Sequence, residues 1–510
     1  MKARVYESLG EIESLVRSGR HEEARARLKA IPASTVPREL LADFAALLRR
    51  TGSISRALKA LNPIVRDPSG LTKASDRERV EYALSLVRAG ANDEASRIFS
   101  AIAPDKEPDV LLYSTFALTP EWRYPETIAP LERYIGLAST GAYQKLVALV
   151  NLAAALIFCE KHAEAERVLL LAMRGAEEQG SLFLLGSLHE LRAQIAIAEK
   201  EFDRAEEHLE KGGRLLGTAA TIESFYVEKW RSLLGFLKDP SKNADRLAQL
   251  RAKAFAIGDW ETARDCDYQA LKASADSQTF EYLYAGSPTL AYRDWLSSKF
   301  PANPRPAAMY MWRLDGERAP DRTMRFLDAS TGETQSGRRI LEAGDAPQRL
   351  LILLARDFYR PQSLGSVASR LFPEEFYHPV HTPMKLHQIL ARLRESLSAA
   401  RLPVRVESDG GFMKLTGRAR FSILKDWTLD TVKLDPTFLR LRPLVARFGH
   451  EAFTAKEAAV ALDVSLSTSS RLLEKACEEG IGSRLGGGKS TRYRLPQKET
   501  TPENRLRPAG

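Results

Sequence analysis

The sequence predicts a mainly α protein in which an N-terminal α-solenoid of helical hairpins is followed by two small α+β domains. Three observations predict this fold: a spaced pattern of alanine and large apolar residues within residues 1–275, a proline-rich boundary after residue 300, and two later segments in which helices precede a short hairpin. With 44% hydrophobic and 28% charged residues, the composition is that of an ordinary folded protein. A chain of 510 residues is long enough for several domains, each with its own core.

The N-terminal pattern is a small residue, a large apolar residue three positions later, an alanine nine residues further on, and a large apolar residue after four more. Small residues let two helices cross closely, while the large ones bury against the next pair. The pattern occurs at Ala45, Leu48, Ala57 and Leu61; at Ala83, Leu86, Ala95 and Phe99; at Ala153, Leu156, Ala165 and Leu169; and more weakly at Ala193, Ala196, Ala205 and Leu209.

Residues 5–275 therefore resemble the tetratricopeptide repeat, whose helical hairpins stack into a superhelix with a concave binding face. The resemblance implies an array over residues 1–275 that binds a protein or peptide partner, or a second copy of the chain in a homodimer. Another helical-repeat family and a role as a spacer both remain open. Residues 276–318 are expected to form a helical segment and a linker, because "SKFPANPRPAA" concentrates three prolines within six residues.

The segment 319–417 is expected to contain short strands, three helices and a hairpin. Its third helix is predicted to start at Thr382 and Pro383, a good N-cap followed by proline, and to run toward Ala399. The turn Asp409-Gly410-Gly411 predicts the hairpin, since glycine supplies the positive φ angles that tight turns need. One face of the third helix is apolar and the other is basic: Leu386, Leu390, Leu393 and Leu397 against Lys385, Gln388 and Arg392, flanked by His387 and Arg394.

Four stretches of this segment, "QRLLILLA", "LFPEE", "ILARLRESL" and "DGGFMKL", resemble the winged helix-turn-helix domain of OmpR-type response regulators. The resemblance implies that the third helix enters the DNA major groove and that the hairpin forms a wing. The residues expected to contact DNA are Lys385, His387, Gln388, Arg392, Arg394 and Lys414. His378, His381 and His387 lack the spacing of a metal site, so we expect loop and surface histidines and no metal.

A second module is predicted at residues 436–496, after a linker at 418–435. Thr454 and Glu457 form a capping box that starts one helix, Ser465 caps the next helix, and Gly480 ends it. The pattern V-S-x-S-T-x-x-R-x-L in this helix resembles the recognition helix of bacterial winged-helix repressors, over residues 436–495. The residues expected to contact DNA are Ser467, Thr468, Ser470 and Arg471 on the helix, and Arg484, Lys489, Arg492 and Arg494 on the wing.

The stretch "RLGGGKSTRYRL" superficially suggests a nucleotide-binding loop. A phosphate-binding loop requires a glycine at position 483, which is serine, and it lies between a strand and a following helix. Here a predicted helix precedes the glycines and a predicted strand follows them. We therefore expect the glycines to bring a wing close to the DNA backbone rather than to bind ATP. Residues 497–510 are expected to be disordered.

The uneven distribution of charge predicts that nucleic acid binds the C-terminal part of the chain. Residues 301–510 carry a net charge of +10 and residues 1–300 carry −1, which together give the +9 of the whole chain. Three isolated cysteines and the lack of an apolar leader predict a cytoplasmic location without membrane insertion. With no catalytic motif or cofactor fingerprint recognised, the expected function is a DNA-binding transcription regulator and not an enzyme. The alternative is a protein-interaction adaptor whose winged helices contact proteins.

Overall fold

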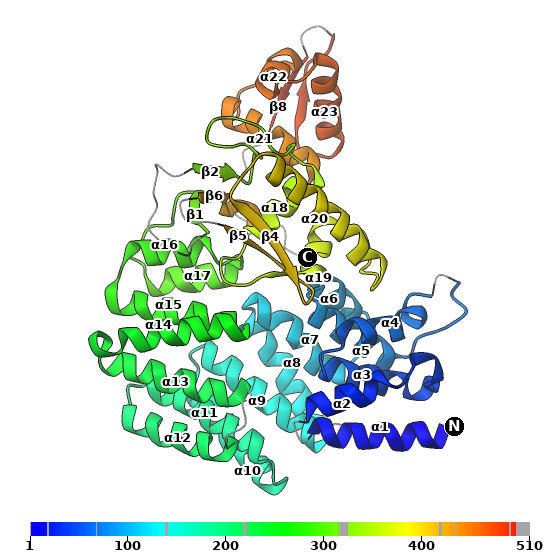
Figure 1. The fold of residues 1–510 in the computed structure, drawn as a ribbon, viewed down its shortest axis with the longest axis vertical. Helices are drawn as coiled ribbons and strands as arrows, with labels where there is room; N and C mark the ends of the chain where they lie inside the picture. The colour runs from blue at the N-terminus through cyan, green and yellow to red at the C-terminus, as the bar shows by residue number, and fades with distance from the viewer. Residues whose placement is uncertain are drawn as a thin grey trace, which may run out of the picture.

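The computed structural model describes residues 2–17, 20–67, 69–137, 141–217, 222–314, 316, 325–417, 421–432, 434–488 and 491–495. Figure 1 shows a helical array with two small modules stacked above it in this view. The predicted disordered tail, residues 497–510, lies outside the described residues.

The array consists of successive helical hairpins. Its helices are α1 (Lys2–Arg17), α2 (His21–Lys29), α3 (Leu41–Arg50), α4 (Ile54–Val65), α5 (Asp76–Ala89), α6 (Asn92–Ser100), α7 (Asp109–Leu118), α8 (Tyr124–Gly136), α9 (Ala142–Phe158), α10 (His162–Glu178), α11 (Leu182–Ala198), α12 (Phe202–Leu216), α13 (Ile222–Lys238), α14 (Pro240–Ile257), α15 (Trp260–Ser274), α16 (Ser277–Ala285) and α17 (Leu290–Lys299). Short 3-10 turns lie at η1 (Ala33–Thr35), η2 (Arg38–Leu40) and η3 (Thr119–Glu121).

The alanine pattern marks helix crossings, as the sequence predicts. Every alanine of its three full copies and of the weaker one is completely buried, and the copies fall on the pairs α3–α4, α5–α6, α9–α10 and α11–α12. The pair α7–α8 has no such copy. There Thr115, Leu118, Thr127 and Leu131 have the same spacing, with buried threonines in the places of the alanines.

The array continues beyond its predicted end at residue 275, through α16 and α17. Aromatic side chains then join its last helix to its middle. The Trp122 ring lies 4.6 Å from the Tyr292 ring and 5.2 Å from the Trp295 ring, measured between centroids. Trp122 precedes α8, whereas Tyr292 and Trp295 belong to α17. These contacts tie the C-terminal helices back onto the middle of the superhelix.

The first module contains two small sheets and three helices. Its elements are β1 (Met309–Arg313), β2 (Arg325–Asp328), α18 (Ala346–Leu354), β3 (Gln362–Ser363), α19 (Leu364–Leu371), α20 (His381–Ala399), β4 (Val404–Asp409), β5 (Phe412–Gly417), β6 (Phe421–Asp426) and the 3-10 turn η4 (Trp427–Thr431). One sheet has the order β1-β6-β2 and the other the order β3-β5-β4. The expected hairpin is present: Gly410 and Gly411 adopt φ angles of +56° and +85° between β4 and β5.

Three sequence predictions for this region need correction. The expected linkers 276–318 and 418–435 contain β1 and β6, and β6 is the central strand of its sheet, antiparallel to β1 and parallel to β2. The alternation of β6 is hidden because Lys425 is buried among its apolar residues. The third helix begins at His381 rather than after a Thr382 cap, since the Thr382 hydroxyl accepts the His378 main-chain N–H at 2.8 Å.

The first module shares a continuous hydrophobic core with the array. At one contact, Gly365 of α19 lies against the turn between α5 and α6. Nearby, the main-chain N–H of Tyr377 donates to Glu94 Oε2 at 2.7 Å. At the other end of the array, Arg264 of α15 donates two hydrogen bonds of 3.0 Å to Asp357, and both side chains are buried. The array and the first module therefore form one unit.

A buried cluster of charges surrounds Asp430 at the same junction. Arg293 of α17 lies 2.6 Å from Asp430 Oδ2, and Lys425 of β6 lies 2.9 Å from the same oxygen. Arg356 donates two hydrogen bonds to the Asp430 main-chain oxygen. Burial lowers the pKa of Lys425 to about 8 and that of Arg356 to about 10. The Asp430 carboxylate thus pairs with two buried cations, and the main-chain oxygen of the same residue accepts from a third.

The second module has a separate core and forms the apex in Figure 1. It comprises α21 (Pro436–Phe448), α22 (Ala455–Leu462), α23 (Leu466–Glu478), β7 (Ser483–Leu485) and β8 (Arg492–Arg494). The Thr454 capping box and the Ser465 cap are present as predicted. Leu439 of α21 belongs to the shared core, whereas Leu444 belongs to the core of the second module, so α21 connects the two.

Glu190 of α11 supplies a pH-dependent contribution to the stability of the array. Burial raises the pKa of its carboxyl from 4.5 to about 7, although Gln194 Nε2 donates to Oε1 at 2.7 Å. Because the folded state binds this proton more tightly than the unfolded chain does, stability falls as pH rises from about 5 to above 7. Glu190→Gln, which cannot ionise, is expected to be about 1–3 kcal/mol more stable than the native chain at pH 8 and similar to it at pH 5.

Thermal unfolding at pH 5 and pH 8 checks this expectation. Glu199→Gln is the matched control, because it makes the same substitution at an exposed glutamate at the end of the same helix. Equal stability of Glu190→Gln and the native chain at pH 8 would contradict the expectation.

Candidate nucleic-acid interface

Helix α20 turns its predicted basic face toward solvent. Lys385, His387, Gln388 and Arg392 are exposed, while Leu386, Leu390, Leu393 and Leu397 are buried on the opposite side. Lys385 Nζ lies 2.6 Å from Glu375 Oε1 and 3.6 Å from the centre of the Phe372 ring, so part of its charge is already compensated. The side chains open to a ligand on this face are therefore His387, Gln388 and Arg392.

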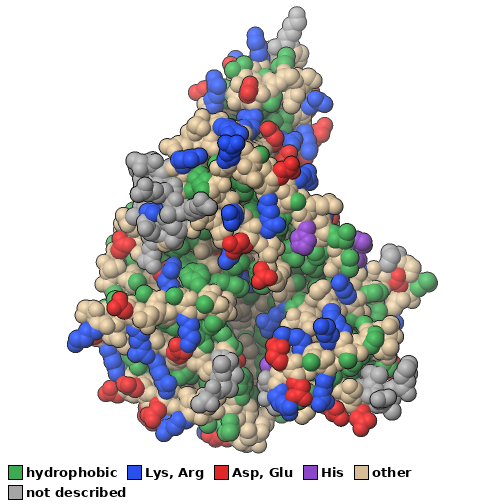
Figure 2. All heavy atoms as spheres, viewed as in Figure 1, with side chains coloured by type: hydrophobic (Ala, Val, Ile, Leu, Met, Phe, Trp, Pro, Cys, Tyr) green, Lys and Arg blue, Asp and Glu red, His purple; other side chains and the backbone are tan. Residues whose placement is uncertain are grey.

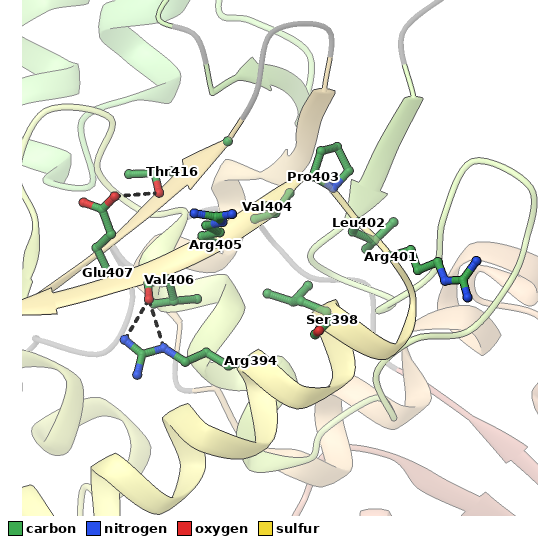
Figure 3. Close-up of a pocket in the computed structure, with 12 residues that line it drawn as sticks. Arg394, Ser398, Arg401, Leu402, Pro403, Val404, Arg405, Val406, Glu407 and Thr416 are labelled. Carbon is green, nitrogen blue, oxygen red and sulfur yellow. Dashed lines mark hydrogen bonds between the residues drawn. The ribbon is translucent and has the colours of Figure 1, made fainter.

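Arg394 holds the hairpin onto α20. Its Nε and Nη2 donate to the Val406 main-chain oxygen at 3.0 and 2.8 Å, as Figure 3 shows. Lys414 of the hairpin lies 3.2 Å from Glu407, and both side chains are exposed. Arg394 therefore positions the hairpin, and Lys414 forms an ion pair with Glu407. The sequence pattern placed both residues at the interface but did not reveal these partners.

A groove of about 780 Å³ lies between the end of α20 and strand β4. Arg394, Arg401 and Arg405 line it together with Glu407 and Thr416. Figure 3 shows Arg401 extending away from the hairpin and Glu407 turned toward Thr416. Arg401 and Arg405 are absent from the predicted set. Arg401 lies beyond the end of α20 and Arg405 lies in β4, whereas the predicted set comprised residues of the helix and Lys414 of the hairpin.

The histidines near α20 organise a loop. His378 Nδ1 accepts the main-chain N–H groups of Val380 and His381, each at 3.2 Å. Burial lowers the pKa of His378, and its ring lies 4.3 Å from that of His381. Within the described part of the chain, no group of three or more His, Cys, Asp or Glu side chains has the geometry of a metal site.

In the second module, α23 exposes its first turns. Ser467, Thr468 and Arg471 are exposed, Ser470 is half-buried, and Ser469 is buried with its hydroxyl donating to the Ala455 oxygen of α22 at 2.9 Å. The Ser465 and Thr468 hydroxyls lie 2.8 Å apart in the helix cap. The buried face fixes α23 on α22, so its other face is presented outward.

The hairpin beside α23 is rich in arginine. Arg484 faces Tyr493 across the β7–β8 pair, and Arg492 and Arg494 lie on either side of the buried Tyr493. Tyr493 exchanges main-chain hydrogen bonds of 3.0 and 2.7 Å with Phe453. One nitrogen of Arg492 donates to the Ala452 oxygen at 3.0 Å. Lys489, the remaining predicted wing residue, lies outside the described residues.

The glycine-rich stretch follows strand β7 and precedes strand β8, so the element directly before it is a strand and not the predicted helix. No helix begins after the glycines as it does in a nucleotide-binding loop, because the next element is β8. Gly486 and Gly488 adopt φ angles of +72° and +64°, which L side chains rarely adopt. The glycines therefore shape the turn of a hairpin.

Apolar side chains also surround the turn between α22 and α23, which sequence reasoning did not single out. Val460 is 70% exposed and Leu466 is 54% exposed, with Val464 between them in the chain. The sequence did indicate these apolar side chains, because Val464 and Leu466 flank the predicted cap Ser465. Figure 2 shows basic side chains distributed over both small modules on the face in view, with acidic side chains among them.

No protein-family model and no curated protein matches the sequence. Among solved structures, the chain is similar to the apo form of RapI, with 12% identity and a TM-score of 0.36 over 58% of this chain and 95% of that one. It is also similar to a Rap protein complexed with competence and sporulation factor, with 11% identity and a TM-score of 0.32 over 77% and 99% of the respective chains. At these TM-scores neither likeness supports a statement about function.

No helix in the described part of the chain is long and apolar enough to cross a bilayer. Cys159, Cys266 and Cys477 are free thiols, and Cys266 is buried.

Proposed function

We propose that the protein is a DNA-binding transcription regulator whose two small modules are winged helices and whose second module provides the principal DNA contact. The observation that carries the proposal is the exposed start of α23, where Ser467, Thr468 and Arg471 lie beside an arginine-rich hairpin. This module has its own core and lies at the end of the molecule farthest from the array (Figure 1). A duplex can approach such a surface without meeting the helical repeats.

The chemistry of this surface suits a major groove. Arg471 can donate two hydrogen bonds to a guanine edge, and serine and threonine hydroxyls accept or donate at any base. Exposed valine and leucine at the start of α23 can contact thymine methyl groups. Arg484, Arg492 and Arg494 on the hairpin neutralise phosphates, which contributes affinity without sequence preference.

The first module contributes a smaller DNA surface in this proposal. Only His387, Gln388 and Arg392 of its predicted set are both exposed and without a partner among the described residues. Its core is shared with the array, which fixes the orientation of α20. We assign to the array the binding of a protein or peptide partner or a second copy of the chain. Figure 2 shows a hollow in the array between its N-terminal and its C-terminal helices. We also assign the protein to the cytoplasm, without enzymatic activity.

The decisive experiment selects genomic DNA fragments with the purified full-length protein at physiological salt and sequences them. Arg471→Ala is expected to weaken binding to the recovered motif about tenfold or more, because a bidentate arginine contact contributes about 1–3 kcal/mol. Arg392→Ala is expected to have a smaller effect. Arg447→Ala is the matched control, since Arg447 is an exposed arginine on α21 of the same module.

Equal affinities of the native protein, Arg471→Ala and Arg447→Ala for the same fragments would contradict the assignment of α23. Recovery of unselected DNA by all of them would favour the second candidate function, a protein-interaction adaptor. A specific observation supports that candidate: around the start of α20, Phe376 and Met384 are each 58% exposed and Val380 is 41% exposed, although the Arg66 guanidinium lies over the Phe376 ring. An apolar patch of this kind is more typical of a protein contact than of a phosphate contact.

A further inference from the structure

A cleft of about 690 Å³ lies where the C-terminal part of the array meets the hairpin of the first module. We call it the array–hairpin cleft. Residues of α14, α15 and α16 line one side, and residues of β1, β5 and the segment after α18 line the other. Its volume is within the range of pockets that hold small organic ligands. None of the predicted roles of the chain uses it.

The walls of the cleft are aromatic. Phe255 and Tyr359 are parallel with ring centroids 6.2 Å apart, and Trp260 and Phe412 approach to 5.5 Å at an angle of 56°. Trp260 and Phe412 are only half-buried, which leaves part of each ring accessible from the cleft. The Trp260 and Phe412 rings contact each other, so a planar aromatic ligand can stack on the accessible part of either ring but not between them.

One cation in the lining has unused hydrogen-bond capacity. The Arg360 guanidinium lies over the Trp260 ring, 5.8 Å from its centroid, and makes no hydrogen bond or ion pair with any described residue. A guanidinium offers five N–H donors in a fork that matches a carboxylate, sulfonate or phosphate. Contact with an aromatic face attracts the cation but leaves these donors unsatisfied.

The other charged groups of the lining are already compensated or lie at its edge. Arg251 is paired with Asp267 at 2.9 Å, Asp357 with Arg264, and Glu407 with Lys414. Arg313 also lines the cleft and has an interaction of its own. Asp409 is exposed at the tip of the hairpin. Arg360 is therefore the group best placed to select the charge of a ligand that stacks on Trp260.

We propose that the array–hairpin cleft binds a small planar aromatic compound with an acidic group, stacked on the accessible part of the Trp260 ring with its anion on Arg360. A ligand there touches the array and the hairpin together and stabilises their contact. The site does not depend on DNA binding, because its elements belong to the array and the first module, whereas the principal DNA contact is assigned to the second module.

The test uses 8-anilinonaphthalene-1-sulfonate as an aromatic anion and its uncharged parent, N-phenyl-1-naphthylamine, as a neutral probe. Both are titrated into the full-length protein and followed by their fluorescence. Arg360→Gln is expected to raise the Kd of the anionic probe about tenfold and to leave that of the neutral probe unchanged. Trp260→Leu is expected to weaken both probes. Arg360→Lys, which keeps the charge, is expected to retain most of the affinity for the anion.

Arg405→Gln is the matched control, because Arg405 is an exposed arginine of the adjacent strand β4 that lines the groove in Figure 3 and not this cleft. Circular dichroism and thermal unfolding of each variant verify the fold. Equal binding of the anionic probe by the native chain and Arg360→Gln overturns the proposal. So does a loss of affinity in Arg405→Gln that matches the loss in Arg360→Gln. Failure here leaves the DNA-binding proposal intact, because the probes report no DNA contact.

Discussion

Asp430→Ala is expected to lower the free energy of unfolding by about 3–5 kcal/mol, because removing one partner of a buried ion pair leaves the other charge uncompensated. Asp430 is 1% exposed, and its carboxylate lies within 2.9 Å of Arg293 and Lys425. Arg293 retains main-chain acceptors at Tyr284 and Trp427, and Lys425 retains two, at Ala285 and Arg356, but these carbonyls carry no full charge. Urea unfolding followed by circular dichroism measures the loss.

Asp345→Ala is the control for Asp430→Ala. Asp345 is paired with Arg440 at 2.8 Å, but both side chains are about half exposed, so the expected loss is below about 1 kcal/mol. Adding Lys425→Met to Asp430→Asn is expected to restore part of the stability, since it removes one of the uncompensated cations. A single Asp430→Asn variant as stable as the native chain would show that the carboxylate charge does not hold this junction together.

The local features of the fold were predictable because short-range chemistry determines them. The buried alanines of the array, the Thr454 capping box, the Ser465 cap and the hairpin turn at Gly410 and Gly411 all lie where the sequence places them. Each depends on residues within a few positions of one another. The unrecognised pair α7–α8 shows the limit of the pattern, because buried Thr115 and Thr127 stand where the pattern expects alanine.

The junction between the array and the first module was not predictable in the same way. Asp430 acquires its partners from positions 74 and 137 residues away in the chain. Likewise β6 was taken for a linker because its buried Lys425 breaks the apolar alternation, and only the cluster around Asp430 explains that lysine. For the candidate interface, the sequence identified an exposed basic face on α20 and exposed polar residues on α23. It did not show that Lys385, Arg394 and Lys414 already have partners.

Gly365→Ala is expected to destabilise the protein by about 1–3 kcal/mol, even though alanine favours a helix more than glycine does. A Cβ at Gly365 would lie 2.3 Å from the Ala89 oxygen and 2.8 Å from the Ala91 nitrogen. Both are main-chain atoms, so no side chain can move aside, and α19 has to shift away from the turn between α5 and α6. Thermal unfolding measures the loss, and hydrogen exchange is expected to show faster exchange in α19 and α6.

Gly10→Ala in α1 is the matched control, since a Cβ there meets no atom within 4 Å and is expected to stabilise the helix slightly. Gly365→Ala and Asp430→Ala test opposite ends of the same junction, because α19 meets the N-terminal half of the array whereas Asp430 meets α17. If both variants lose stability, the first module is held on the array at both ends of the junction. If Gly365→Ala is as stable as the native chain, α19 does not press on the array in solution, and the first module is held only at the Asp430 end.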